Sequence, residues 1–186
     1  MADEFEGASP REQAVEAARR NNPELLQELI DKVGKKGGDK GSPEAVAEFL
    51  NTARDGVGYG LLHLAAMNGK YDVLDLLLDQ EGVEIDHEDR MEKDTPLHKA
   101  VRFVNSLKPE SWEDGKEIVD ILIDAGCDPR IRNKGKLKPI ELVDPRNKDL
   151  IEALRKAEWN IMYANDIPEA EADEDEGPTG SASDSD

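Results

Sequence analysis

The chain has 186 residues, a length that fits one domain with a substantial core and a tail. It carries 43 acidic and 24 basic residues, giving a formal net charge of −19. This charge argues against a nucleic-acid-binding protein, since contacts with phosphate need a basic surface. The excess of carboxylates favours a protein partner with a basic surface, or it serves solubility alone.

The sequence indicates a reducing compartment and no contact with a membrane. Cys127 is the single cysteine, so no internal disulfide can form. Residues 1–6 are acidic and hold no apolar run, unlike a signal peptide. No stretch approaches the roughly 18 apolar residues that a membrane-spanning helix needs. We therefore expect a monomeric protein of the cytoplasm, the nucleus or both.

Residues 9–33 are predicted to form the first of four related pairs of short helices. Ser9-Pro10 combines a helix N-cap with a proline at the first helical position, which predicts a helix over residues 12–20. Apolar residues at spacings of 1, 3 and 4 predict a second helix over residues 24–33. The exposed face of the first helix is polar, which suits the end of a repeat array.

Residues 34–41 form a glycine- and lysine-rich connection to the next unit. A short helix is expected from Ser42 to about Leu50, followed by a hairpin finger at residues 51–55. The glycine-lysine run lacks both the glycine spacing and the preceding strand of a phosphate-binding loop. We therefore interpret it as a mobile loop.

The second unit, residues 51–82, has the clearest pattern. It opens with Gly60-Leu61-Leu62-His63 and continues into a leucine-rich run. The spacing of the apolar residues predicts a first helix over residues 61–68 and a second over residues 71–79.

The third unit, residues 89–127, repeats this opening as Thr95-Pro96-Leu97-His98. About ten extra residues, around residues 105–115, separate its two helices. We expect the first helix to run on to Val104 or Leu107 and the second to begin early, near Glu110.

The fourth unit, residues 133–157, is degenerate because it lacks both the threonine and the histidine of the third unit. These departures fit a cap at the C-terminal end of the array. Four side chains are expected to fold back over that end: Trp159, Ile161, Met162 and Tyr163.

Residues 1–8 and 164–186 are expected to be disordered. The second segment has nine acidic residues, no lysine or arginine, and too few apolar groups to offset the entropy of ordering. Removing nine charges from −19 leaves −10 on the rest of the chain, so the body is acidic as well. Ser181 and Ser183 each have an aspartate three positions on, so phosphorylation of both is a hypothesis.

Residues 9–160 resemble the ankyrin repeat family, in which the first helix of each unit begins with T-P-L-H-x-A. The leucines of this motif, Leu62 and Leu97, lie 35 residues apart, close to the usual repeat of about 33. The resemblance implies an all-α solenoid of about four helix-turn-helix units with short hairpin fingers. It also implies that Thr95-Pro96 caps a helix, and that His63 and His98 tie neighbouring units together by hydrogen bonds.

In such an array each unit leaves one apolar helix face that only a neighbouring unit can cover. The side chains expected to be buried are Leu64, Ala65, Ala66, Val73, Leu76, Leu77, Leu97, Ala100, Val119, Leu122 and Ile123. Their burial should stabilise each interface by roughly 1.5–3 kcal/mol per large side chain.

The resemblance further implies that partners contact the fingertips and the exposed side of each first helix. Carried over, these positions are Val57, Tyr59, Met67, Asn68, Met91, Glu92, Asp94, Arg102, Phe103, Lys134 and Leu137. Several are aromatic or thioether residues, which are common interface anchors. Phe103 either contacts a partner or packs beneath the third-unit insertion. Trp112 either fills that insertion locally or adds a contact.

No motif in the sequence carries catalytic chemistry, and we predict no enzyme activity, no cofactor and no metal. His87 stands alone, and the acidic finger at residues 84–92 lacks the spacing of a calcium loop. Cys127 occupies a small packed position of the repeat and is not expected to act as a nucleophile.

The sequence therefore predicts a non-enzymatic protein–protein interaction module. The acidic surface favours an escort or chaperone for a basic client, similar to small acidic ankyrin proteins of fungi that accompany a newly made ribosomal protein. The alternative is a regulatory subunit or inhibitor of a kinase, a transcription factor or an assembly complex.

Overall fold

The computed structural model describes residues 7–35 and 42–163. The terminal segments predicted to be disordered lie outside these residues, apart from positions 7 and 8. Ser181, Ser183 and most of the glycine-lysine connection also lie outside them.

The described residues form a stack of antiparallel helices in which strands are limited to one isolated bridge, between Arg54 and Gly60. None of these helices is long and apolar enough to cross a membrane. The elements are α1 (Pro10–Arg20), α2 (Pro23–Lys35), α3 (Pro43–Thr52), α4 (Leu61–Met67), α5 (Tyr71–Leu78), α6 (Pro96–Ser106), the 3-10 turn η1 (Pro109–Ser111), α7 (Trp112–Asp124), the 3-10 turn η2 (Pro139–Leu142) and α8 (Lys148–Tyr163).

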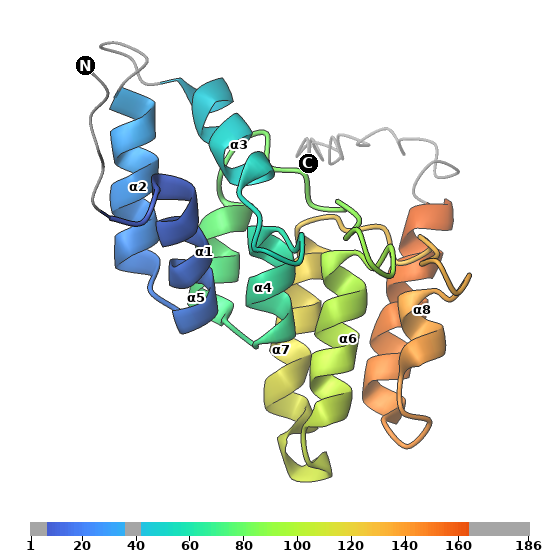
Figure 1. Cartoon of the computed structure of the whole chain (residues 1–186). Coiled ribbons are helices and arrows are strands. Elements are labelled where there is room, and N and C mark those ends of the chain that lie inside the picture. Colours follow the sequence, from blue (N-terminus) through green and yellow to red (C-terminus); the bar gives the residue numbers. More distant parts are fainter. Residues whose placement is uncertain (1–6, 36–41, 164–186) are drawn as a thin grey trace, which may run out of the picture.

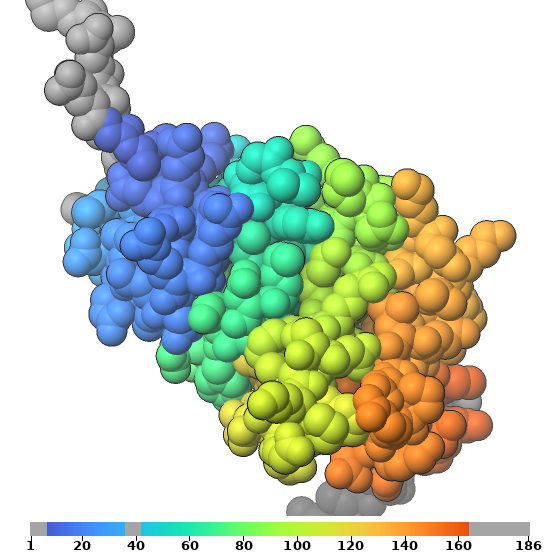
Figure 2. Space-filling view, turned by 60° about the horizontal axis from the view of Figure 1, so that its bottom comes forward, coloured from blue at the N-terminus to red at the C-terminus, as the bar shows by residue number. Residues whose placement is uncertain are grey.

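The helices stack in two rows, as Figure 1 shows. The inner row runs α1, α4, α6 and η2, and the outer row runs α2, α5, α7 and α8, with each element contacting the next in its row. Figure 2 shows the units as adjacent blocks in sequence order. This arrangement confirms the predicted all-α solenoid.

The core lies between and within the two rows. All the side chains predicted to be buried are buried except Leu76 and Ile123, which are half-buried on the flanks of α5 and α7. The inner helices carry alanines at their contacts, such as Ala14, Ala65 and Ala100, which are inaccessible to solvent. Small side chains let consecutive inner helices approach closely, so a short helix can still bury most of its surface.

The helix starts follow the caps seen in the sequence. Ser9 forms a capping box with Glu12, in which the Glu12 N–H donates to Ser9 Oγ at 3.3 Å and the Ser9 N–H donates to Glu12 Oε2 at 2.6 Å. Ser42 caps α3 by accepting from the Ala45 N–H at 3.2 Å. Helix α3 runs on to Thr52, so the first finger starts later than predicted and spans residues 54–60.

The third-unit insertion lengthens both helices of that unit, as predicted. Helix α6 ends at Ser106, and η1 leads directly into α7. The Leu107 side chain packs closely against Gly115 inside α7, where a Cβ would lie 2.5 Å from Leu107 Cδ1. A larger residue there would require the half-buried Leu107 side chain to move.

The end of the fourth unit differs from the expectation. Its first helix is reduced to the turn η2, and α8 continues without a break to Tyr163. The predicted folding back of Trp159, Ile161, Met162 and Tyr163 is therefore wrong. Residues 148–163 contain no proline or glycine, so nothing in the sequence stops the helix before Tyr163.

Candidate protein-binding surface

Three fingers precede α4, α6 and η2 and lie side by side, at the upper ends of α4 and α6 in Figure 1. An aspartate or asparagine at the base holds each one. Asp55 Oδ1 accepts from the N–H groups of Val57, Gly58 and Tyr59 at 2.8–3.0 Å. In the second finger, Asp89 Oδ1 accepts from the Met91 and Glu92 N–H groups, both at 2.8 Å. In the third, Asn133 Oδ1 accepts from the Leu137 N–H at 3.1 Å. These bonds close each fingertip as a local turn and fix its shape.

The fingers touch one another and form a continuous surface, which we call the finger ledge (residues 54–60, 89–94 and 133–137). The Arg90 side chain lies against Gly58, where a Cβ would be only 3.0 Å from Arg90 Cδ. Between the second and third fingers, the Lys134 N–H donates to the Glu92 carbonyl at 2.7 Å. The ledge is therefore one rigid surface contributed by three units.

Apolar side chains project from the ledge into solvent. Val57 is 51% exposed, Met91 52% and Leu137 40%, and Glu92 is exposed beside Met91. Large apolar groups held outward on well-formed turns are a feature of protein interfaces. Their position matches the prediction, although contact with a partner stays a prediction.

The predicted residues on the inner helices are also accessible. Met67 is 37% exposed at the end of α4, and the adjacent Asn68 bonds back to the Leu64 carbonyl at 2.7 Å. The Arg102 side chain on α6 is 46% exposed. These positions extend the candidate surface from the fingers onto the inner helices.

One histidine on α4 and one on α6 each join their helix to the finger that follows it, as the resemblance implied. His63 Nε2 donates to the Asp94 carbonyl at 2.9 Å, and His98 Nε2 donates to the Leu137 carbonyl at 3.0 Å. The Thr95 N–H and hydroxyl both lie within hydrogen-bond distance of His98 Nδ1, at 3.1 and 2.9 Å. Because Nδ1 accepts the N–H bond, the proton of neutral His98 is on Nε2. Burial lowers the pKa of His63 to about 4 and also lowers the pKa of His98.

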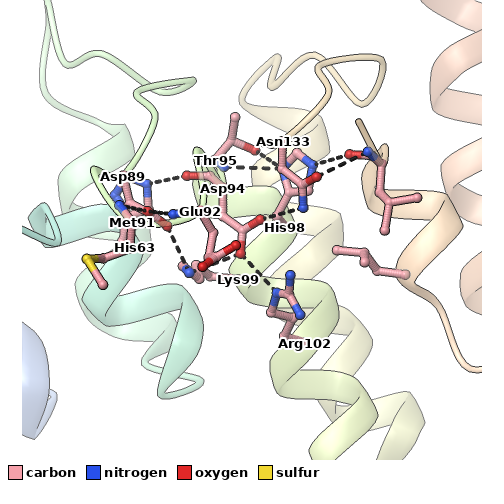
Figure 3. Close-up of polar contacts among 12 residues, drawn as sticks. His63, Asp89, Met91, Glu92, Asp94, Thr95, His98, Lys99, Arg102 and Asn133 are labelled. Carbon is pink, nitrogen blue, oxygen red and sulfur yellow. Dashed lines mark hydrogen bonds and ion pairs between the residues drawn. The ribbon is translucent and has the colours of Figure 1, made fainter. Parts of the chain in front are cut away.

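A buried polar cluster lies beneath the second finger, shown in Figure 3. Asp94 accepts from Asn133 Nδ2 at 2.8 Å through one oxygen, and from Lys99 Nζ at 3.0 Å and Arg102 Nε at 2.9 Å through the other. The same Lys99 ammonium forms an ion pair with Asp89 Oδ2 at 2.8 Å. The cluster thus joins the second finger, α6 and the third finger.

Asp94 was predicted to contact a partner, and the structure corrects this. Its side chain has no exposed surface, because the stacking of the third and fourth units encloses it. Burial alone would raise the pKa of Asp94, but the bonds from Asn133, Lys99 and Arg102 outweigh it and lower that pKa. Burial would likewise lower the pKa of Lys99, but Asp89 and Asp94 raise it. The cluster is therefore charged and structural.

The predicted aromatic residues are half-buried. The Tyr59 ring lies 4.8 Å from Lys99 Nζ and stacks with the His63 ring at 6.4 Å between centroids, so it covers the polar cluster. Phe103 packs against Gly69, where a Cβ would lie 2.2 Å from Phe103 Cζ.

Trp112 has a packing role at the start of α7. Its ring centroid lies 5.6 Å from the Arg146 guanidinium, which comes from the loop before α8. Trp112 therefore connects the insertion to the fourth unit, in agreement with the local-filling interpretation.

Charge is distributed unevenly over this surface. The approach to the second finger is acidic, with exposed Glu84 and Glu88, whereas the second finger itself exposes Arg90 and Lys93 beside Glu92. The third finger and its flanking residues carry Arg130, Arg132, Lys134, Lys136 and Lys138. Two of the outer helices concentrate carboxylates. Helix α5 has Asp72 and Asp75 and ends at the C-cap Asp79, with Lys70 at its N-cap, and α7 has Glu113, Asp114, Glu117, Asp120 and Asp124 against Lys116 alone. Net charge alone did not reveal the basic third finger, although its run of lysines is visible in the sequence.

The described residues offer no group of three or more His, Cys, Asp or Glu side chains placed to hold a metal ion. Cys127 is buried, with its thiol 3.7 Å from the Ile85 carbonyl. Burial raises the pKa of this thiol, which keeps it protonated and a poor nucleophile.

Comparisons with known proteins agree with the architecture. The family described as ankyrin repeats (3 copies) matches residues 14–133. The ankyrin repeat-containing protein YGL242C of Saccharomyces cerevisiae is 40% identical over 162 residues, which cover 86% of this chain and 84% of the yeast protein. Alpha-latrocrustotoxin-Lt1a of Latrodectus tredecimguttatus is 28% identical over 107 residues, or 58% of this chain and 6% of the toxin. With stacked helix pairs, linking histidines and fingers in place, the chain belongs to the ankyrin repeat family.

Proposed function

We propose that this protein holds a client protein on the finger ledge and shields a basic surface of that client. Ankyrin repeats form protein-interaction modules, which supports the general role. The observation that carries the proposal is the ledge itself, where Val57, Met91 and Leu137 stand exposed on turns fixed by Asp55, Asp89 and Asn133. Because these turns are already ordered, their backbone loses little conformational entropy when a partner covers them.

The charge around the ledge favours a basic client. Exposed Glu92 lies beside Met91, exposed Glu84 and Glu88 precede the second finger, and the chain as a whole has a formal net charge of −19. Long-range attraction of this sign speeds association with a basic protein and covers its lysines and arginines before other polyanions reach them. That is the chemistry of an escort.

The basic third finger favours a second candidate, a regulatory subunit or inhibitor. Exposed Lys134 and Lys136 belong to the finger that contacts Glu92 of the second finger, so the ledge presents both signs of charge. Such a ledge matches the mixed surface of a folded enzyme or transcription factor better than it matches a uniformly basic polypeptide.

Affinity capture with the tagged full-length protein tests the proposal. Wild type should retain a client at about 50 mM salt and lose much of it at about 500 mM. The triple variant Val57→Ser/Met91→Ser/Leu137→Ser should lose it at both. Tyr71→Ser is the matched control, because Tyr71 is 43% exposed on the outer row, away from the fingers. Salt-independent retention would contradict electrostatic shielding, and an unaffected triple variant would exclude the ledge.

Two charge reversals separate the candidates. A basic client should bind Glu92→Lys more weakly and Lys136→Glu at least as tightly as wild type. A regulated partner held by the third finger should show the opposite order. Both side chains are exposed, so neither change should affect folding.

A further inference from the structure

The outer face of α8 is apolar where the end of a solenoid should be polar. Trp159 is 58% exposed, Met162 57% and Tyr163 41%. Their spacing of three and four residues places them on one helix face. The Trp159 and Tyr163 rings lie 4.6 Å apart, so they form one cluster, which we call the α8 patch (Trp159, Met162 and Tyr163).

The patch points away from the stack. Leu150, Leu154 and Ala157 are the buried residues of α8, and they occupy the opposite face of the helix. Helix α8 packs against α7 and η2, and Figure 1 shows it at the end of the stack. The patch therefore occupies the position where a further unit would pack.

The other end of the stack shows what an ordinary terminal face looks like here. Apart from Pro10, which begins α1, the exposed residues of α1 and α2 are charged or carry amides. In α2 they are Glu24, Gln27, Glu28, Asp31, Lys32 and Lys35. Terminal units need such a polar face for solubility. The cluster on α8 departs from that requirement at one end only, which marks it as a docking surface.

Size and charge identify the occupant. With about 200 Å² for each whole side chain, the patch exposes roughly 300 Å², less than half of what each partner of a stable dimer buries. Residues 164–186 follow Tyr163 in the sequence with nine carboxylates and no basic residue. A second copy of the chain would bring two such segments together, and their repulsion disfavours it. A partner carrying lysine and arginine would gain from the same segment.

We propose that the α8 patch docks an amphipathic helix of a partner protein, whose apolar stripe is flanked by lysine and arginine. The helix takes the place of the missing next unit. Exposed Arg155 and Lys156 lie one turn before Trp159 on α8, so the basic residues of the partner helix should lie away from them. This docking surface is separate from the finger ledge and goes beyond the function proposed above.

A direct test uses a synthetic 18-residue helical peptide of leucine and lysine, with a leucine–glutamate peptide of the same pattern as its control. The chain has two tryptophans, so the indole N–H signals of the ¹⁵N-labelled full-length protein report on two places. The lysine peptide should shift the Trp159 signal saturably and leave the half-buried Trp112 signal in place. The glutamate peptide should shift neither.

Variants separate the α8 patch from the ledge. Trp159→Ala/Met162→Ala should lower the affinity for the lysine peptide at least tenfold, as expected for a central aromatic anchor. Val57→Ala/Met91→Ala on the ledge should bind like wild type. Replacing Asp173, Glu174, Asp175 and Glu176 by their amides in the full chain should weaken binding severalfold.

Four results would overturn the proposal. The first is a Trp159 signal that does not move at a saturating concentration of the lysine peptide, and the second is equal binding of the lysine and glutamate peptides. The third is unchanged binding of the lysine peptide after either the patch or the amide substitutions. The fourth is a dimer in light scattering that Trp159→Ala/Met162→Ala abolishes. The last result would identify a second copy as the occupant. None of them bears on the ledge, whose role depends on the capture experiment.

Discussion

Replacing Asp94 by asparagine should destabilise the protein without touching its surface. The asparagine keeps the shape of the side chain and one oxygen that can accept from Asn133. It removes the charge that pairs with Lys99 and Arg102. Arg102 is 46% exposed and can return to water, whereas the Lys99 side chain is only 7% exposed. The main cost is therefore one weakened charge pair at a buried lysine that keeps Asp89 as its other partner.

The expected cost in the free energy of unfolding is about 2–4 kcal/mol, below the upper range for breaking a buried pair because Asp89 remains. With a slope near 2 kcal/mol per molar urea, the unfolding midpoint should fall by about 1–2 M, measured by circular dichroism. Glu92→Gln is the control, since it makes the same charge change two residues away on an exposed side chain. It should stay within about 0.5 kcal/mol of wild type. Equal midpoints for the two variants would refute a structural role for the cluster.

Three further predictions concern single positions. Burial lowers the pKa of His63 to about 4 from an ordinary value of 6.5, so only the unfolded chain binds this proton between those pH values. The free energy of unfolding should therefore fall as the pH drops from 6.5 to 4, by up to about 3 kcal/mol from this group, and His63→Gln should flatten the slope in a pH series of urea titrations. Gly115→Ala should change the free energy of unfolding by less than about 1 kcal/mol, because the new methyl group meets only the tip of the half-buried Leu107 side chain and alanine favours the helix by about 1 kcal/mol; a drop in melting temperature of more than about 8 °C would contradict this. Ser9→Ala should cost about 1 kcal/mol in the same assay through loss of the α1 capping box, and an unchanged melting temperature would show that α1 needs no cap.

The helix pairs could be predicted because their signals are local. Ser9-Pro10 and Thr95-Pro96 mark helix starts, and the apolar spacing in α5 and α7 gives the helical period within a dozen residues. Such signals depend only on neighbours along the chain. Register followed from the recurrence of the leucine in the T-P-L-H motif, and the histidine bonds confirmed it.

The candidate site was predicted less completely. The exposed tips Val57, Met91 and Leu137 were found because the repeat pattern fixes where a fingertip falls. Asp94 was misplaced because a fingertip residue can turn toward the solvent or toward the next unit. Which side it takes depends on Asn133, 39 residues away in the sequence. No local pattern carries that information.

By itself the sequence determined that this protein is a stack of helix pairs and that it is strongly acidic, since periodicity, caps and composition are properties of the chain alone. Only the tertiary structure decided which charges are buried, that the fingers join into one ledge, and that Trp159 faces outward from the last helix. The reason is that burial depends on contacts between units far apart in the sequence. At the end of the array there is no next unit to cover an apolar face.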